Sequence, residues 1–191
     1  ADRPRADTRT YNGERVAVML PLEINRAVKQ LAASQRATVF ATMLTGFAAL
    51  VARLSGQRDF VVGIPVAGQS FLESQELVAH CVNFVPLRCQ VDPSATFASQ
   101  LDAMRQQSLA INEYYNFTYG SLLNKLRLPR NPSRDPLVTV SFTVEPAIED
   151  LGFHGLAATL RTVPRTTAKR DMHVNVMETA TGLLVEADVN R

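Results

Sequence analysis

The spacing of apolar and polar residues predicts helices and strands in alternation. A strand is expected over residues 15–20, and Pro21 then stands at the start of a helix over residues 22–34. A second helix is expected to begin after Thr38, whose hydroxyl can cap it, and to stop at Gly56. The apolar residues at helical spacing are Ile24, Ala27, Val28 and Leu31 in the first helix, and Phe40, Met43, Leu44, Phe47, Leu50, Val51 and Leu54 in the second.

The run from Asp59 to Val66 is apolar at nearly every position and rich in valine and isoleucine. Such a short run, bounded by glycine and proline, is typical of a strand that is buried on both faces. We therefore expect an α/β fold with a mixed central sheet covered by helices. The remaining elements are predicted as strands over residues 83–91, 137–145, 157–163, 172–178 and 183–189 and helices over residues 96–115 and 119–126, with a turn at "TATG" between the last two strands.

The stretch "RNPSRDPLVTVSFTVEP", residues 130–146, joins a polar, proline-containing loop to a strand. Thr139, Ser141 and Thr143 alternate along that strand and so share one of its faces. The residue pattern alone favours an ordinary antiparallel strand that turns these three hydroxyl groups toward water.

The composition indicates one compact domain or part of one. The chain has 191 residues, of which 46% are hydrophobic and 20% are charged, so it can bury a sizeable core. Residues 1–14, "ADRPRADTRTYNGE", combine proline, glycine and charge without periodicity. We expect a linker or extended arm there, and a folded part over residues 15–191.

The charge pattern argues against nucleic acid and membrane as partners. The 20 lysines and arginines exceed the 18 aspartates and glutamates by two, and the basic residues are scattered. Polar residues interrupt the longest apolar run, residues 39–54, well before the roughly 20 residues that a membrane span requires. The chain opens without a charged and then apolar leader, so a cytoplasmic location is expected.

The residues on their own do not form a catalytic or metal-binding set. No GxSxG nucleophile turn occurs, and "GIPVAG" at residues 63–68 lacks the lysine and hydroxyl of a phosphate loop. His80, His154 and His173 lack metal-ligand spacing. Cys81 and Cys89 lie eight residues apart and are interpreted as plain buried thiols.

Several stretches, in order along the chain, resemble the condensation domains of nonribosomal peptide synthetases, which belong with the chloramphenicol-acetyltransferase-like acyltransferases. The stretch of residues 38–69 resembles the family's helix, its "SGQ" turn and a strand ending in a "GxPVAGR"-like sequence. The other similar stretches are "ADRPR" at the start, "AHCVNFVPLR" (79–88) for "GxFVNTxxxR", "NEYYNFTYGSLL" (112–123) for the region of "HQxxPF", and "RNPSRDPL" (130–137) for "RDxSRxPL".

The resemblance assigns roles to four residues. It implies that Arg134 is a buried or partly buried structural arginine held by forked hydrogen bonds, with Arg130 in the same bracing loop. Ser141 and Asn83 are implied to lie along the substrate tunnel, with Ser141 facing the acceptor amine. For Asn83, a structural hydrogen bond to the backbone stays open as the alternative.

The sequence also departs from the family pattern. Gln69 stands where arginine is common, Cys81 where phenylalanine is common, and Tyr114 or Tyr115 at the usual histidine. "HCVN" and "YGSLL" are similar to condensation domains of mixed polyketide and peptide assembly lines. The family's catalytic "HHxxxDG" motif is missing, because no histidine here is followed by aspartate four positions later.

The resemblance therefore implies the C-terminal lobe of a condensation domain, without its N-terminal lobe and terminal helix. The parent enzyme joins a carrier-bound acyl or peptidyl donor to an aminoacyl acceptor by an amide bond. Both substrates ride on phosphopantetheine arms, and no cofactor binds directly. The implied partners are the N-terminal lobe and the carrier proteins, and the lobe alone is expected to be inactive. The alternatives are a noncatalytic carrier-docking module and an ester-forming or coenzyme A dependent acyltransferase of the same fold.

Overall fold

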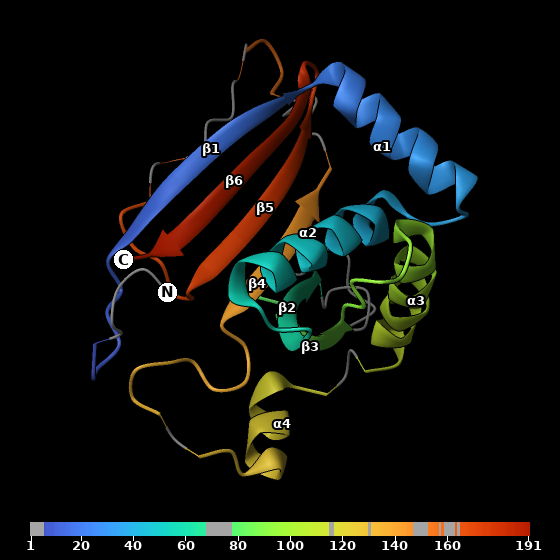
Figure 1. Ribbon diagram of the computed structural model, residues 1–191. Coiled ribbons are helices and arrows are strands. Elements are labelled where there is room, and N and C mark those ends of the chain that lie inside the picture. The colour runs from blue at the N-terminus through green and yellow to red at the C-terminus, as the bar shows by residue number, and fades with distance from the viewer. Residues whose placement is uncertain are drawn as a thin grey trace.

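The computed structural model of the protein describes residues 6–67, 78–114, 117–129, 131–146, 153–156, 158, 163 and 165–191. In this part of the chain the elements alternate as a mixed α/β fold (Figure 1). They are β1 (Gly13–Pro21), α1 (Leu22–Ser34), α2 (Val39–Ser55), β2 (Asp59–Ala67), β3 (Val82–Gln90), α3 (Phe97–Ala110), the 3₁₀ helix η2 (Ile111–Tyr114), α4 (Tyr119–Leu126), β4 (Val140–Glu145), β5 (Met172–Thr179) and β6 (Gly182–Asn190).

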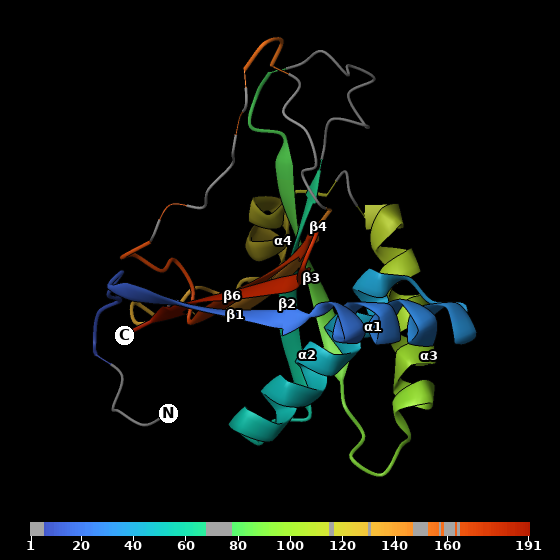
Figure 2. The ribbon, with the colours of Figure 1, turned by 90° about the horizontal axis from the view of Figure 1, so that it is seen from above.

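The described strands form one sheet in the order β1-β6-β5-β4-β2-β3. Strand β4 runs parallel to both of its neighbours, whereas the other neighbouring pairs are antiparallel. Strands β2 and β4 are paired only at Val62 with Val140 and at Gly63 with Ser141, a junction that we call the seam. Because the seam is so short, β2 and β3 can turn away from the rest of the sheet, and Figure 2 shows them crossing the direction of β1 and β6.

One face of the sheet, which we call the helix face, carries the apolar core under α2 and α3. Phe142 of β4 is 1% exposed and stacks on Phe47 of α2 with ring centroids 5.0 Å apart. Burying one such side chain contributes about 1.5–3 kcal/mol. Buried residues of α2, β2, β3, α3, β5 and β6 complete this core. They include Leu44, Val62, Ile64, Leu87, Met104, Val174, Val176 and Leu183.

Three helices begin at threonines whose hydroxyls cap them. Thr38, Thr96 and Thr118 each accept a hydrogen bond from a backbone N–H three residues later, at 3.0, 3.2 and 3.2 Å. Each cap contributes about 1 kcal/mol by satisfying an N–H that the helix leaves free. Gly56, with φ 71°, ends α2 in the left-handed conformation that favours glycine.

The predicted fold class and most predicted elements are confirmed. Helices 22–34 and 119–126 have the predicted bounds, and the "TATG" turn joins β5 to β6. Helix 96–115 is shorter than predicted, because it tightens into η2 after Ala110. Strand β1 begins two residues before the predicted strand, at Gly13, and the predicted strand 157–163 lies largely outside the described residues.

The buried side of α1 differs from its apolar pattern. Ile24 and Leu31 are 43% and 37% exposed, whereas Asn25 and Ala32 are buried. No residue separates β1 from α1, so the strand fixes how the helix is turned. The Nδ2 of Asn25 donates a hydrogen bond to Glu178 Oε1 at 3.1 Å, whereas its buried Oδ1 has no partner among the described residues.

The prediction of a wet antiparallel strand over residues 137–145 is wrong. The strand begins at Val140, since Leu137 has φ 65° and the N–H of Val138 bonds back to the carbonyl of Pro136 at 2.7 Å. β4 is an interior strand with parallel partners on both sides, and Ser141 is 0% exposed. The buried hydroxyl therefore needs a partner inside the protein.

The helices give no single membrane span in the part of the chain that the structure describes. Only α1 and α2 together reach the length and apolar composition of a span, and they meet at a bend of 105°.

Candidate functional site

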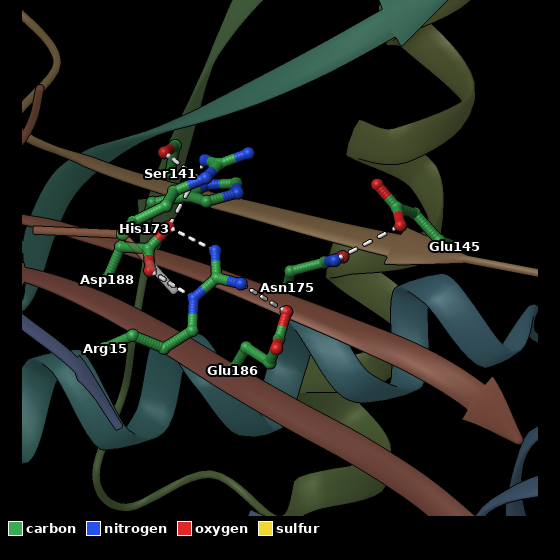
Figure 3. A network of polar contacts seen from close by, with 8 residues as sticks. Arg15, Ser141, Glu145, His173, Asn175, Glu186 and Asp188 are labelled. Carbon is green, nitrogen blue, oxygen red and sulfur yellow. Dashed lines mark hydrogen bonds and ion pairs between the residues drawn. The ribbon is translucent and has the colours of Figure 1, made fainter. Parts of the chain in front are cut away.

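The second face of the sheet, which we call the polar face, is lined by charged and hydrogen-bonding side chains (Figure 3). They occupy alternate positions of strands whose other positions fill the apolar core, as the pleat of a strand requires. They come from β1, β4, β5 and β6: Arg15, Ser141, Glu145, His173, Asn175, Glu186 and Asp188.

Arg15 is the centre of a buried ion-pair cluster on the polar face. Its Nε and Nη2 donate to the two carboxylate oxygens of Asp188 at 2.6 and 2.9 Å, and its Nη1 lies 3.1 Å from Glu186 Oε2. Arg165 Nη1 approaches Asp188 Oδ2 at 3.3 Å. The hydrogen bonds from Arg15 lower the pKa of Asp188, so this carboxylate stays ionised although it is only 5% exposed.

His173 and Ser141 form a hydrogen-bonded pair beside this cluster. Ser141 Oγ lies 2.9 Å from His173 Nδ1, and His173 stands opposite Asp188 in the β5–β6 pairing. Burial lowers the pKa of His173, an effect that the charge of Asp188 opposes. The imidazole is therefore held neutral at pH 7, and the pair is an internal contact, because Ser141 has no exposed surface.

Asn83 hydrogen-bonds to the backbone, as expected if its role is structural. Its Nδ2 donates to the carbonyl of Phe117 at 3.2 Å, and its Oδ1 accepts from the N–H of Phe84 at 2.8 Å. Asn83 thus ties β3 to the segment before α4. These bonds involve other residues than the Ser141–His173 pair, so the two predicted tunnel residues belong to different contacts.

The structural role predicted for Arg134 is wrong. Arg134 is exposed, whereas the next residue, Asp135, receives a forked pair of hydrogen bonds from Arg9, with Nη2 to Oδ2 at 2.8 Å. The loop is braced by an arginine of the N-terminal arm, because the arm runs alongside it and the N–H of Arg9 also bonds to the carbonyl of Pro132 at 3.0 Å. Arg130 lies outside the described residues.

Arg170 adds a cation near the seam. Its guanidinium lies over the ring of Phe84, 3.9 Å from the ring centroid, and Phe84 meets the ring of Tyr119 edge-on at 5.3 Å. Gly63 of β2 makes room for this stack, because a Cβ there would overlap the Phe84 ring. The stack therefore depends on glycine at this position.

The cysteines differ in their surroundings. Cys89 is buried, as predicted, and burial raises the pKa of its thiol to about 12, whereas Cys81 is only half-buried. Within the described ranges, no group of three or more His, Cys, Asp or Glu side chains is placed to hold a metal ion.

A cavity of about 560 Å³ opens where β2 and β4 end. The carboxyl ends of adjacent parallel strands are a frequent position for ligand binding in α/β proteins. Its walls come mainly from α2, β2, α3 and β4 and are mostly apolar, with a few polar groups. The lining residues include Ala41, Ile64, Val66, Arg105, Ser108 and Thr143.

The comparisons with known proteins identify the family. The condensation-domain family model matches residues 1–191, the whole chain. The chain belongs to the condensation-domain family. It is 30% identical over 193 aligned residues to a linear gramicidin synthase of Brevibacillus parabrevis, covering 100% of this chain and 4% of that protein.

Solved structures confirm the fold of this condensation-domain chain. The condensation domain of the monacolin K polyketide synthase MokA matches with a TM-score of 0.85 at 19% identity, over 97% of this chain and 43% of that one. The X-domain from teicoplanin biosynthesis matches with a TM-score of 0.84 at 16% identity, over 98% and 44%. The chain thus spans well under two thirds of the proteins that it matches.

The sequence interpretation missed the main polar residues of the site. It considered His173 only as a metal ligand or a catalytic histidine, and it gave Arg15, Arg170 and Asp188 no role. A usable signal was present, because each polar-face residue has at least one polar or small neighbour two residues away in the sequence. Which strands lie side by side could not be read from that pattern.

Proposed function

We propose that this condensation-domain chain is the C-terminal lobe of an enzyme that forms amide bonds between carrier-bound substrates. The amine of an aminoacyl thioester attacks the carbonyl of an acyl or peptidyl thioester, the C–N bond forms, and the donor's pantetheine thiol leaves. The family match over all 191 residues carries this proposal. Holding two tethered reactants in line would supply much of the rate.

The lobe assignment is supported by what this sequence lacks and by its length relative to its neighbours. No HxxxD sequence occurs in these 191 residues, which supports a base for the amine proton that belongs to other residues of the synthetase. The chain also corresponds to 43% of the MokA condensation-domain chain. We propose that the N-terminal lobe provides the histidine and that this lobe provides the facing wall and the acceptor side.

The polar face is the part of the lobe best suited to line the substrate tunnel. It presents ion-paired and hydrogen-bonded groups, among them Arg15, Asp188 and Ser141, that can orient a thioester and an amine. We assign Ser141 a positioning role there, since its hydroxyl holds His173 at Nδ1. Asn83 would act at the tunnel by fixing β3 against residue 117, and phosphopantetheine arms would bring the substrates.

A transfer assay on the intact synthetase tests the reaction. Donor and acceptor carriers loaded with thioesters should give the amide product, whereas the 191-residue chain alone should give none. Comparing amine with alcohol acceptors, and carrier with coenzyme A thioesters, separates amide formation from the ester-forming and coenzyme A dependent alternatives. Amide formation by the chain alone would disprove the lobe proposal. Polyketide and peptidyl donors, offered in parallel, test the mixed assembly line that the sequence motifs suggest.

The role of Ser141 is tested by Ser141→Val in the same assay. We expect the condensation rate to fall about tenfold, because His173 loses the hydrogen bond that fixes its ring. Thr45→Val is the matched control, since it removes a buried hydroxyl from α2 that bonds to the Ala41 carbonyl of its own helix. Equal rates in the two variants would remove Ser141 from the mechanism.

A docking module without catalysis is the second candidate. The X-domain has the same fold at a TM-score of 0.84 and is described in complex with OxyB, so the fold alone fits protein docking as well as catalysis. A synthetase that binds its loaded carriers but forms neither amide nor ester would favour this candidate.

A further inference from the structure

Arg170 is the half-buried arginine that lacks a carboxylate. Among the described residues, Arg9, Arg15, Arg105 and Arg170 are the arginines of intermediate exposure. The first three are ion-paired, with Asp135, with Asp188 and Glu186, and with Asp102. Within the described ranges Arg170 has no ion pair and no hydrogen bond from its side chain, and its Nε is fully buried without an acceptor.

The surroundings hold Arg170 in place without neutralising it. The Phe84 ring below the guanidinium attracts the cation through its face, which offsets part of the cost of burial. The nearby carboxylate of Asp135 already accepts both hydrogen bonds of the Arg9 fork. The ring position itself is set by Gly63, so the aromatic platform is part of the folded sheet.

The balance of charge around Arg170 favours a further negative group. Burial lowers the pKa of Arg170, and the charge of Arg9 adds to this effect, while Asp135 and Tyr119 oppose it. An arginine stays protonated even so, because its pKa lies far above neutrality. A half-buried charge without a partner carries part of the cost of desolvation, and such groups are frequent where a ligand supplies the partner.

We propose that Arg170 is an oxyanion-binding residue of the polar face, and that it accepts a carboxylate or phosphate group of a bound molecule on the planar fork of its guanidinium. The fork matches both groups by two parallel N–H donors. On the proposed function, the oxyanion comes either from the phosphate of the phosphopantetheine arm or from a carboxylate on the substrate. The binding itself does not depend on that function.

Arginine labelling on the intact synthetase tests the binding directly. Phenylglyoxal modification of Arg170 is followed by mass spectrometry with four probes at equal ionic strength: phosphopantetheine against pantetheine, and acetate against acetamide. Each pair differs by the oxyanion. We expect at least one oxyanion to slow the labelling of Arg170 about threefold or more, its neutral counterpart to have no effect, and exposed Arg134 to react equally in all four.

The pair that shows protection identifies the source of the oxyanion, phosphate or carboxylate. Equal labelling of Arg170 with all four probes would overturn the proposal. That outcome includes the case in which a carboxylate from elsewhere in the polypeptide already holds the fork and Arg170 reacts slowly throughout.

Substitutions separate this inference from the proposed reaction. Arg170→Gln should lower kcat/KM about tenfold for substrates with the identified oxyanion and leave the matched neutral substrates unchanged, while Arg170→Lys, which keeps the charge but loses the fork, should fall between. Arg53→Gln on α2 is the control for removing one exposed positive charge. If the synthetase shows no condensation activity at all, the proposed function is contradicted, but the labelling result still holds. If Arg170→Gln lowers kcat/KM equally for both substrate types, the oxyanion role is contradicted.

Discussion

The two faces of the sheet are built from the same strands but are held together by different forces. On the helix face, Phe142 is buried by the rings of Phe47 and Phe40 and by aliphatic neighbours. On the polar face, the neighbouring residue Ser141 is buried just as completely. Its hydroxyl is hydrogen-bonded to His173, beside the Arg15–Asp188 ion pair. The comparison indicates that complete burial is reached in two ways, by apolar packing on the helix face and by hydrogen bonds and ion pairs on the polar face.

The helix face should carry the larger share of stability. Phe142→Ala removes a ring that is 1% exposed and leaves a cavity between β4 and α2, so we expect the free energy of unfolding to fall by about 3–5 kcal/mol. Urea denaturation measures this change. Leu50→Ala on α2, where the side chain is 49% exposed, is the control and should change stability by under about 1 kcal/mol. Similar losses in the two variants would break the comparison.

The polar face should respond most to loss of its central carboxylate. Asp188→Asn leaves Arg15 with a buried charge that only Glu186 balances, and we expect a loss of about 2–3 kcal/mol. Asp102→Asn, which breaks the more exposed pair with Arg105, should cost at most about 0.5 kcal/mol. If both substitutions had the same small effect, the cluster would not be a stabilising network.

The pH dependence of the free energy of unfolding should show a smaller contribution, which comes from His173 on the polar face. The pKa of His173 is lowered in the folded state, first by burial and then by Arg170 and Arg165, while Asp188 and Glu145 oppose the shift. The unfolded state therefore binds more protons once the pH falls below about 6.5, the ordinary histidine value. Stability should decline from there down to the folded pKa, and this group should add nothing further below it.

Urea unfolding of wild type, His173→Gln and His154→Gln at pH 7.5, 6.5 and 5.5 checks this expectation. His154 is exposed, so its replacement controls for the loss of one histidine. The decline should be flatter in His173→Gln alone. A parallel decline in all three proteins would show that His173 does not cause it.

The smallest expected difference is in the reactivity of the two thiols, which is measured without changing the stability of the chain. Burial on the helix face raises the pKa of Cys89 to about 12, so at pH 8 the thiol is neither ionised nor accessible. A thiol reagent should modify half-buried Cys81 in the native chain and reach Cys89 only after urea is added. Mass spectrometry of the labelled peptides distinguishes the two. Rapid native labelling of Cys89 would show that the helix face opens easily.

The sequence predicted the helix face well because apolar periodicity and caps are local signals. The run from Phe40 to Leu54 and the cap at Thr38 specified α2 without knowledge of its neighbours. The start of β4 was predicted too early. Leu137 adopts a positive φ and forms a turn, and a leucine in the sequence gives no indication of this conformation. Parallel pairing of β4 was also missed, because strand neighbours far apart in sequence are set by the whole fold.

The polar face could be predicted only in part. The resemblance pointed to Ser141, but its partner is His173, 32 residues further along the chain. It pointed to Arg134 in the bracing loop, whereas the ion pair there joins Arg9 and Asp135, 126 residues apart. Side-chain pairs of this separation depend on strand order and register, which a single sequence does not encode locally.

The seam has a consequence for exchanging segments between members of the condensation-domain family. Only two residue pairs join β2 to β4, and Phe142 of β4 packs against Phe40 and Phe47 of α2, so these rings tie β4 to the helix above it. A hybrid whose crossover point falls between α2 and β4 would take these rings from different parents and lose their fit. Crossover points placed before Thr38 or after Pro146 keep the three rings from one parent, so hybrids made there should keep this ring packing.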